Sequence, residues 1–240
     1  SGEAPAALAD VDATDVDAIG LDAVVEFFAT ELERYQNRRL ADRYRALVHA
    51  VRDAEQALPG APVGLARAVA SHAFDALAAK DEYEVARLAS DPRFLAELRA
   101  RYGARARPVF HFAPAWLGRR ATRDGRRGKI AVGPWIVVVL RALAALKFLR
   151  GSRFDPFARQ SERIAQRRFT DRYCAGLARI AASLRPDNLD AALEFARLPG
   201  NVRGYGHVRM PKLDAALQAA ERLWPAFEAT PFTPAHGAHR

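Results

Sequence analysis

Apolar residues recur every three or four positions along most of the chain, which is the period of one face of an α-helix. The pattern becomes regular near Leu21 and continues to Leu58, so it predicts one long helix or two helices in series. Shorter stretches of the same pattern predict further helices over residues 65–77, 81–88, 91–103, 155–184, 187–197 and 211–228. The chain is therefore predicted to be mainly α, with about seven or eight helices.

Several helix ends are marked by residues that commonly begin or stop a helix. Asp91-Pro92 and Asp155-Pro156 each place a side-chain acceptor and a proline where the first turn of a helix needs them. Asp187 and Pro211 predict two later starts, and Gly103 predicts a stop. These signals divide the helical pattern into separate helices.

Two short segments break the helical period. Residues 108–112 and 129–132 are apolar and β-prone, and they flank a connector rich in Gly and Arg. They predict one small β-hairpin. The stretch from Trp135 to Leu149 is apolar nearly all round and contains two charged residues. Because it is too short to span a bilayer, it predicts a buried core helix.

The two ends of the chain lack helical periodicity. Residues 1–20 are predicted to form a flexible acidic arm or linker, and residues 231–240 a flexible tail. Residues 21–230 are predicted to form a single helical domain, because a chain of 240 residues can bury a core of its own. The chain opens with Ser-Gly and no initiator Met, which suggests a fragment of a longer polypeptide.

Charge is distributed unevenly along the chain. Residues 1–33 hold nine Asp and Glu and no Lys or Arg, which excludes the basic start of a secretory signal peptide. The formal net charge is +9, so the remaining residues carry +18. Such a charge favours nucleic acid, an anionic membrane, a phosphorylated ligand or an acidic protein as partner. The single cysteine, Cys174, fits a reducing compartment, and we expect a cytoplasmic location.

The sequence contains no motif of a standard nucleotide or metal site. It has no Cys pair, no Gly-x-Gly-x-x-Gly after a strand and no Gly-Lys-Ser/Thr loop. The close pair His236 and His239 lies in the Pro-rich tail, which is a poor support for a metal ion. The cluster Asp81, Glu82 and Glu84 could serve acid–base chemistry. Its place at a helix start favours a structural role, since the helix dipole attracts acidic groups there.

Two basic segments are candidates for anion or protein binding. Residues 203–209 combine two glycines, two arginines and a histidine, although a tight turn between helices gives the same pattern. Residues 101–129 hold nine basic side chains against Asp124 alone, and a solvated loop is the alternative. Nucleic-acid binding usually adds exposed aromatics, whereas Phe110 and Phe112 share one strand face and are typical of a core.

A set of phrases in fixed order is more specific than these motifs. They are Tyr35-Gln36-Asn37, ADRYRALV (41–48), KDEYEVARL (80–88), FHFAP (110–114), Gly133-Pro134-Trp135, Leu149-Arg150-Gly151 with FDPF (154–157), and RGYGHV (203–208). In this order they resemble the C-terminal region of the fused indolepyruvate ferredoxin oxidoreductases, usually described as a domain of unknown function. The resemblance covers about residues 24–227.

The resemblance implies a parent enzyme that oxidatively decarboxylates an aryl 2-oxoacid such as indolepyruvate, forms acyl-coenzyme A and reduces ferredoxin. Thiamine diphosphate, iron–sulfur clusters and coenzyme A are implied for that parent. One cysteine cannot supply the roughly four thiolates of a cluster, so we expect no cofactor in this chain. We expect an accessory domain with no catalytic, cofactor-binding or metal-binding residues. Its expected partners are the parent's catalytic domains or subunits and, as a further candidate, ferredoxin, with no membrane partner.

The candidates for docking or anion binding are the polar residues of the shared phrases: Lys80, Asp81, Glu82, His111, Arg150, Arg203 and His207. The +18 charge motivates an acidic protein surface or the phosphates of coenzyme A as their partner. Two alternatives stay open. One is a basic helical module that binds nucleic acid, and the other is an enzyme with its own pocket around His111 and His207.

Overall fold

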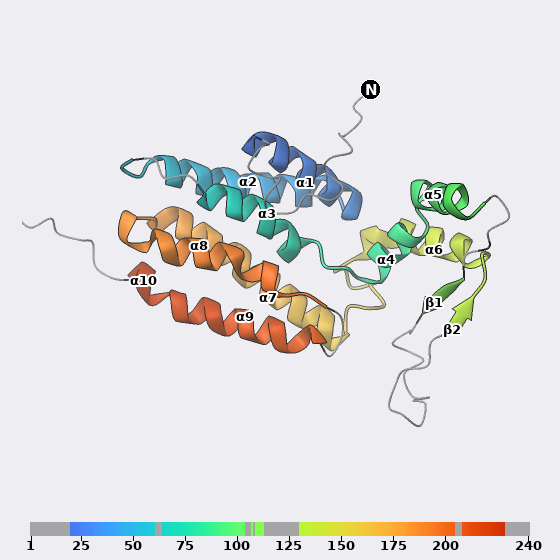
Figure 1. Cartoon of the computed structure of the whole chain (residues 1–240). Helices are drawn as coiled ribbons and strands as arrows, with labels where there is room; N and C mark the ends of the chain where they lie inside the picture. Colours follow the sequence, from blue (N-terminus) through green and yellow to red (C-terminus); the bar gives the residue numbers. More distant parts are fainter. Residues whose placement is uncertain are drawn as a thin grey trace, which may run out of the picture. The chain divides into compact units, whose positions relative to one another are not determined.

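The computed structural model describes residues 20–60, 64–103, 107, 109–112, 130–204 and 208–228. These residues are mainly α-helical, which confirms the predicted fold class (Figure 1). Contacts group the chain into two compact units, Ser1–Ala79 with Asp155–Arg240 (unit 1) and Lys80–Phe154 (unit 2). The sequence predicted one domain over residues 21–230, and the contacts form these two groups within it.

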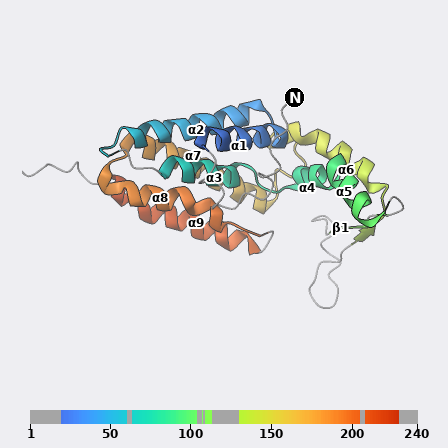
Figure 2. The same ribbon diagram turned by 45° about the horizontal axis from the view of Figure 1, so that its top comes forward.

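Unit 1 is a bundle of helices. Its elements are α1 (Leu21–Tyr35), α2 (Arg38–Gln56), α3 (Leu65–Leu77), α7 (Ser161–Ser183), η5 (Pro186–Asn188), α8 (Leu189–Arg197), η6 (Leu198–Asn201), α9 (Met210–Leu223) and α10 (Pro225–Glu228), where η marks a 3-10 helix. Helices α1, α2 and α3 pack on one another; α2 also packs against α7, and α3 packs against both α7 and α8 (Figures 1 and 2). Helix α9 packs on α7 and α8.

The first helical stretch is two helices in series, because Asn37 begins a new one. Its side chain accepts a hydrogen bond from the amide of Leu40 at 3.0 Å, which caps α2. The last predicted stretch is also divided, since α10 starts at Pro225. These divisions bring the described α-helices to ten, above the seven or eight predicted.

The core of unit 1 joins helices that are distant in sequence. Two buried tyrosines satisfy their hydroxyl groups across helix pairs. Tyr44 of α2 donates to the carbonyl of Ala70 in α3 at 2.8 Å, and Tyr173 of α7 donates to the carbonyl of Ala196 in α8 at 2.8 Å. The largest fully buried side chains include Tyr44, Leu32, Leu65, Leu177, Ile180, Phe195 and Leu213.

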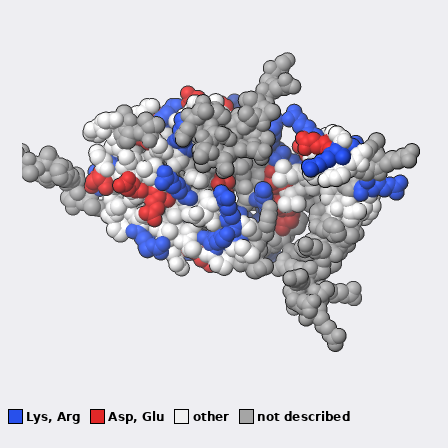
Figure 3. All heavy atoms as spheres, in the orientation of Figure 1, with Lys and Arg blue, Asp and Glu red and all other residues white. Residues whose placement is uncertain are grey.

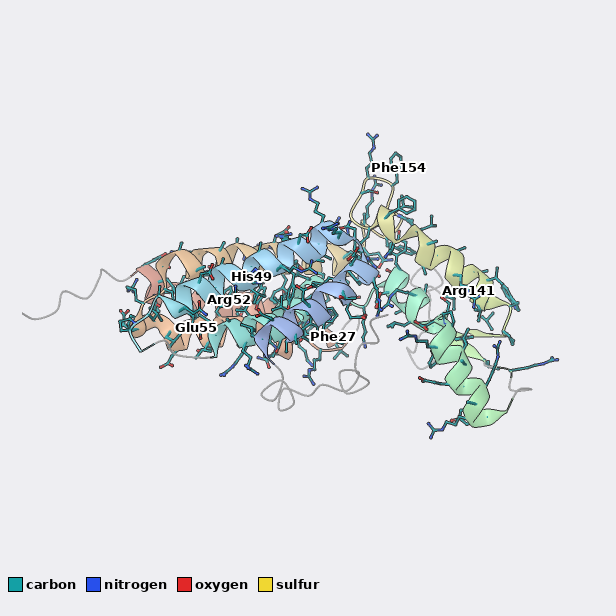
Figure 4. All side chains as sticks on the ribbon, turned by 90° about the horizontal axis from the view of Figure 1, so that it is seen from above. Phe27, His49, Arg52, Glu55, Arg141 and Phe154 are labelled. Atoms are coloured by element: carbon teal, nitrogen blue, oxygen red, sulfur yellow. The ribbon has the colours of Figure 1, made fainter. Side chains whose placement is uncertain are left out.

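Both ends of α3 are bonded by side chains of other helices. The buried carboxylate of Glu55 in α2 accepts from the first two amides of α3, at 2.6 and 3.0 Å (Figure 4). At the other end, the carbonyl of Ala76 accepts from Gln166 at 3.0 Å and from Thr170 at 2.7 Å, both in α7. Free amides and carbonyls at buried helix ends need such partners. These bonds therefore hold α3 between α2 and α7.

Unit 2 contains three α-helices and two short strands. Its elements are α4 (Glu82–Ala89), α5 (Pro92–Tyr102), β1 (Phe110–Phe112), β2 (Ile130–Val132), α6 (Ile136–Ala145) and η4 (Leu146–Leu149). Helix α4 packs against α5, α6 and η4. Strands β1 and β2 pair antiparallel, with Phe110 opposite Val132, where the sequence predicted a hairpin. The connector between them lies outside the described residues.

Several predicted helix boundaries are confirmed. The carboxylates of Asp81 and Asp91 accept from amides in the first turns of α4 and α5, at 2.8 and 2.7 Å. Gly103 ends α5 with a φ of 90°, a backbone conformation that favours glycine. Pro211 lies in the first turn of α9. Each of these boundaries depends on bonds or backbone geometry within a few residues.

Two predicted helix starts are wrong. The residues after Asp155 form turns, and α7 begins at Ser161. The buried Asp155 carboxylate accepts from the amide of Phe157 at 3.0 Å. Asp187 lies within η5, and its carboxylate accepts from Arg185 at 3.0 Å and does not cap α8. In both places the carboxylate bonds to a neighbour two residues away, which is a common use of Asp in turns.

The prediction of a buried core helix over Trp135 to Leu149 is also wrong. The stretch is helical, but Leu140 is its single buried residue. Val138 is 71% exposed and Trp135 is 65% exposed. An apolar helix is buried only where neighbouring elements are present to cover all of its faces, and the described part of unit 2 covers one.

Candidate docking surface

Helix α6 has two faces with different surroundings. The face that contains Leu140, which is 6% exposed, packs against α4. On the opposite face, apolar side chains recur at intervals of three and four positions and therefore lie on one side of the helix. We call this set the α6 stripe: Trp135, Val138, Val139, Ala142, Ala145 and Leu146, all of which are exposed.

The apolar exposure continues beyond the end of α6. Phe148 in η4 is 68% exposed, and Phe154 in the following loop is 66% exposed (Figure 4). Single exposed apolar residues are normal on protein surfaces, whereas a contiguous apolar set marks an interaction site. The α6 stripe is therefore a candidate docking surface.

Basic residues border the α6 stripe. Arg141 is the one charged residue in the sequence between Trp135 and Leu146, and it is exposed (Figure 4). Lys147, Arg150 and Arg153 follow, and the sequence has no Asp or Glu between residues 130 and 154. The segment thus combines an apolar helix face with basic groups and no acidic one.

Arg150 is occupied by an internal ion pair with Asp81. The guanidinium donates to both carboxylate oxygens, from Nε at 2.6 Å and from Nη2 at 2.9 Å. The two side chains are 8% and 2% exposed. The guanidinium also lies 5.4 Å from the ring centroid of Tyr83, which is within cation–π distance. Because Asp81 caps α4 as well, this pair joins the end of η4 to the start of α4.

The structure therefore gives Asp81 and Arg150 a structural role. They are 69 positions apart in sequence and are brought together within unit 2. Removing one partner of a buried pair leaves an unpaired charge, which costs about 3–5 kcal/mol. Close to them, Lys80 is exposed and Glu82 is half-buried in the first turn of α4.

The remaining predicted candidates are Arg203, His111 and His207. Arg203 belongs to unit 1, where it is exposed and donates to the carbonyl of Gly200 at 3.1 Å. Gly204 beside it has a φ of 107°, as the alternative of a tight turn requires. His111 lies in β1 opposite Ala131, and its side chain is outside the described part. His207 is outside the described residues. Of the predicted candidates whose side chains the structure describes, Asp81 and Arg150 are brought into direct contact.

Unit 1 contains a second candidate, an aromatic groove. A cavity of about 260 Å³ lies between α7, α8 and α9. Its floor includes the parallel rings of Tyr173 and Phe195, with centroids 5.4 Å apart, and the indole of Trp224. A Cβ at Gly176 would lie 2.2 Å from the Phe195 ring, so only glycine allows this close packing. The volume is at the small end for a ligand site.

The polar groups of this groove are already paired. Arg172 contacts Glu221 at 3.2 Å, and Arg179 contacts Glu228 at 2.8 Å. Burial raises the pKa of Tyr173 well above its usual value, and its hydroxyl is bonded to a carbonyl. Burial also raises the pKa of the adjacent Cys174 thiol, which makes it a poor nucleophile. The groove is therefore better explained by packing than by catalysis.

Among the described residues, no three His, Cys, Asp or Glu side chains come together in a way that could hold a metal ion. None of the helices in the described ranges combines the length and the apolar character needed to cross a membrane.

A model of a protein family of unknown function, DUF6537, matches residues 21–222. The chain belongs to this family. No curated protein and no solved structure matches the chain. The DUF6537 match spans residues of both units and includes the α6 stripe, the Asp81–Arg150 pair and most of the aromatic groove.

The residues of the α6 stripe were missed as candidates in the sequence. The available signal was a helix of this DUF6537 chain that is apolar on all sides and has Arg141 within it. Such a helix is buried either in its own domain or against a partner. The sequence pattern is the same in both cases, and the packing of α4 on one face distinguishes them.

Proposed function

We propose that this chain is a docking domain of a larger enzyme, an indolepyruvate-type 2-oxoacid:ferredoxin oxidoreductase. The parent would oxidatively decarboxylate aryl 2-oxoacids to acyl-coenzyme A and reduce ferredoxin. The α6 stripe carries the docking part of the proposal, because contiguous exposed apolar residues are typical of protein contact sites. The ordered sequence phrases support the choice of parent enzyme.

Catalysis is assigned to other parts of the parent enzyme. Thiamine diphosphate, iron–sulfur clusters and coenzyme A would bind there and not to this chain. The buried thiol of Cys174, with its raised pKa, is unsuited to ligate a metal as thiolate. A cytoplasmic location belongs to the same proposal, because a chain with one cysteine and no disulfide fits a reducing compartment.

The test compares the parent enzyme with and without this region. Indolepyruvate- and coenzyme A-dependent reduction is followed with ferredoxin and, in parallel, with a small artificial electron acceptor. We expect activity to fall with both acceptors, because an assembly contact would be lost. Loss with ferredoxin alone would place the ferredoxin site here, and full activity with both acceptors would contradict the proposal.

Nucleic-acid binding is a second candidate function, favoured by the charge of unit 2. Residues 80–154 hold 17 Lys and Arg against six Asp and Glu. Polyanion binding of this kind weakens steeply with salt, by roughly a thousandfold or more between about 50 and 200 mM for six or more phosphate contacts. Binding of the chain to duplex and single-stranded DNA at these two salt concentrations tests it. Absence of binding at the lower concentration would exclude it.

A further inference from the structure

We infer that the α6 stripe forms a permanent interface with a protein surface that is apolar at its centre and acidic at its edge. This inference rests on the proposed function and deepens it, because it names the docking surface and the kind of partner. The docking residues are then the apolar side chains of α6, and the charged residues of the shared phrases do not make the main contact.

The composition of the α6 stripe favours a permanent contact over a transient one. Transient electron-transfer interfaces are small, whereas permanent interfaces are more hydrophobic and resemble a protein core. All six positions of the stripe are apolar, and its four large side chains are between 41% and 71% exposed. A surface of this kind suits a subunit or domain that stays bound, and it does not suit a partner that must dissociate in every turnover.

The charges around the α6 stripe specify the edge of the partner. Arg141 lies at the border of the stripe, and the guanidinium of Arg153 lies 4.9 Å from the ring centroid of Phe154. Arg150 is neutralised by Asp81. Since residues 130–154 contain no acidic residue, a partner with Asp and Glu around its apolar centre complements this surface. Basic partners would be repelled.

Unit 1 offers no comparable surface among its described residues. Its exposed large hydrophobic residues are Ile164, at 52%, and Val208, at 47%. The aromatic groove of unit 1 has its charged rim paired internally. Ile164 is on α7 and is exposed to a similar degree as the residues of the stripe, so it serves as a matched control for a substitution on α6.

Other classes of partner fit the α6 stripe less well. Nucleic acid would contact the arginines and leave the valines of the stripe in water, so their exposure would remain unexplained. A second copy of this chain would bring the same basic borders together, and the like charges would repel. An anionic lipid surface would match the charge, and it is therefore included as an outcome in the experiment.

The first experiment places a photo-crosslinking amino acid at position 138, and in a separate protein at position 164, within the complete natural polypeptide. We expect position 138 to crosslink to one protein segment that contains apolar residues flanked by Asp or Glu, and position 164 to give no such product. If that segment lies in the catalytic part of the oxidoreductase, both the inference and the proposed function stand. If it lies in a different protein, the inference stands and the proposed function fails.

Three results overturn the inference. They are a crosslink from position 138 to a second copy of this chain, a crosslink to lipid, and no crosslink at all. Sedimentation with vesicles of phosphatidylglycerol and phosphatidylcholine tests the lipid case separately. We expect the protein not to bind the vesicles. If it binds them and Val138→Asp abolishes this binding, the partner of the α6 stripe is a membrane surface and not a protein.

The second experiment measures the strength of the assembly. Val138→Asp is expected to weaken it by about tenfold or more, as for the loss of one buried large apolar contact. Ile164→Asp is expected to leave it unchanged. Arg141→Glu tests the acidic edge and is expected to weaken assembly more at low salt than at high salt. Equal effects of Val138→Asp and Ile164→Asp would overturn the inference.

Discussion

Unit 1 buries its apolar side chains, whereas unit 2 leaves many of its own exposed. Among the described residues, 30 buried hydrophobic residues belong to unit 1 and four belong to unit 2. Eleven of the 13 exposed large hydrophobic residues in the same described set belong to unit 2, although it is the smaller unit. A small unit buries a smaller fraction of its surface, but size does not place six apolar residues on one helix face.

The two units also differ in charge. Unit 1 contains 20 Lys and Arg against 22 Asp and Glu, and unit 2 contains 17 against six. Unit 2 therefore carries the whole net positive charge of the chain. On the face of unit 1 that Figure 3 shows, acidic and basic side chains lie interspersed. Unit 1 therefore buries most of its apolar residues and has nearly equal numbers of acidic and basic ones, whereas unit 2 has an apolar and basic surface of the kind that suits a binding partner.

The largest expected difference is between the loss of a buried side chain in unit 1 and the loss of an exposed one in unit 2. Phe195→Ala in unit 1 should lower the free energy of unfolding by about 3–5 kcal/mol, because a fully buried ring is removed. Val138→Ala in unit 2 should change it by less than about 0.5 kcal/mol, because the side chain is mostly in water. Urea unfolding of the isolated chain measures both. A large loss for Val138→Ala would show that α6 is buried within the chain.

The next effect concerns the ion pair of unit 2. Asp81→Ala should destabilise unit 2 by about 3–5 kcal/mol, since it removes the carboxylate that accepts two hydrogen bonds from the buried guanidinium of Arg150. Lys80→Ala next to it is exposed and should cost less than about 0.5 kcal/mol. Hydrogen exchange of the amides in α4 and α6 reads the effect in unit 2 alone. The double variant Asp81→Ala with Arg150→Met should cost less than the sum of the single changes, and simple additivity would argue against a direct pair.

A smaller effect is expected at the N-terminal end of α3. Glu55→Gln keeps the size of the side chain and replaces a carboxylate that accepts from two amides, so it should cost about 1–3 kcal/mol. Glu194→Gln on the exposed side of α8 is the control and should change little. Thermal unfolding of the two variants provides the comparison. Equal stability of both variants would mean that Glu55 does not hold α3.

The smallest expected effect depends on pH and concerns the ion pair between Glu26 of α1 and Arg45 of α2. The hydrogen bond from Arg45 lowers the pKa of Glu26 below its ordinary value. A carboxylate with a lowered pKa in the folded state stabilises the fold above its ordinary pKa, and this contribution is lost as pH falls. Because the pair is exposed, Glu26→Gln should cost less than about 1 kcal/mol near neutral pH, and the cost should shrink as pH falls below the ordinary pKa of a Glu carboxyl. A difference between the two proteins that grows on acidification would contradict this assignment.

The helices of this chain could be predicted from sequence because their signals are local. The period of apolar residues gave their positions, and caps such as Asp81 and Asp91 gave several starts. The prediction was wrong at Asp155 and Asp187, where the carboxylate bonds within a turn. An Asp that bonds within a turn looks the same in sequence as an Asp that caps a helix, since both carboxylates accept hydrogen bonds from nearby groups.

The docking surface could not be predicted because burial depends on contacts between distant segments. The sequence marked Asp81 and Arg150 as polar residues of shared phrases, but their pairing across 69 positions exists only in the folded unit. The apolar pattern of α6 was read correctly as a helix and wrongly as a buried one. The sequence pattern shows whether each face of a helix is apolar or polar, but it does not show which other segment or partner covers that face.

Hydrogen exchange of α6, compared between this chain alone and the proposed parent enzyme, tests most directly whether the α6 stripe is an interface. We expect the amides of α6 to exchange more slowly in the parent, because a bound partner suppresses local opening of the helix. The amides of α7 in unit 1, near Leu177, should exchange at the same rate in both. Equal exchange of α6 in the two proteins would contradict the claim that the α6 stripe is an interface.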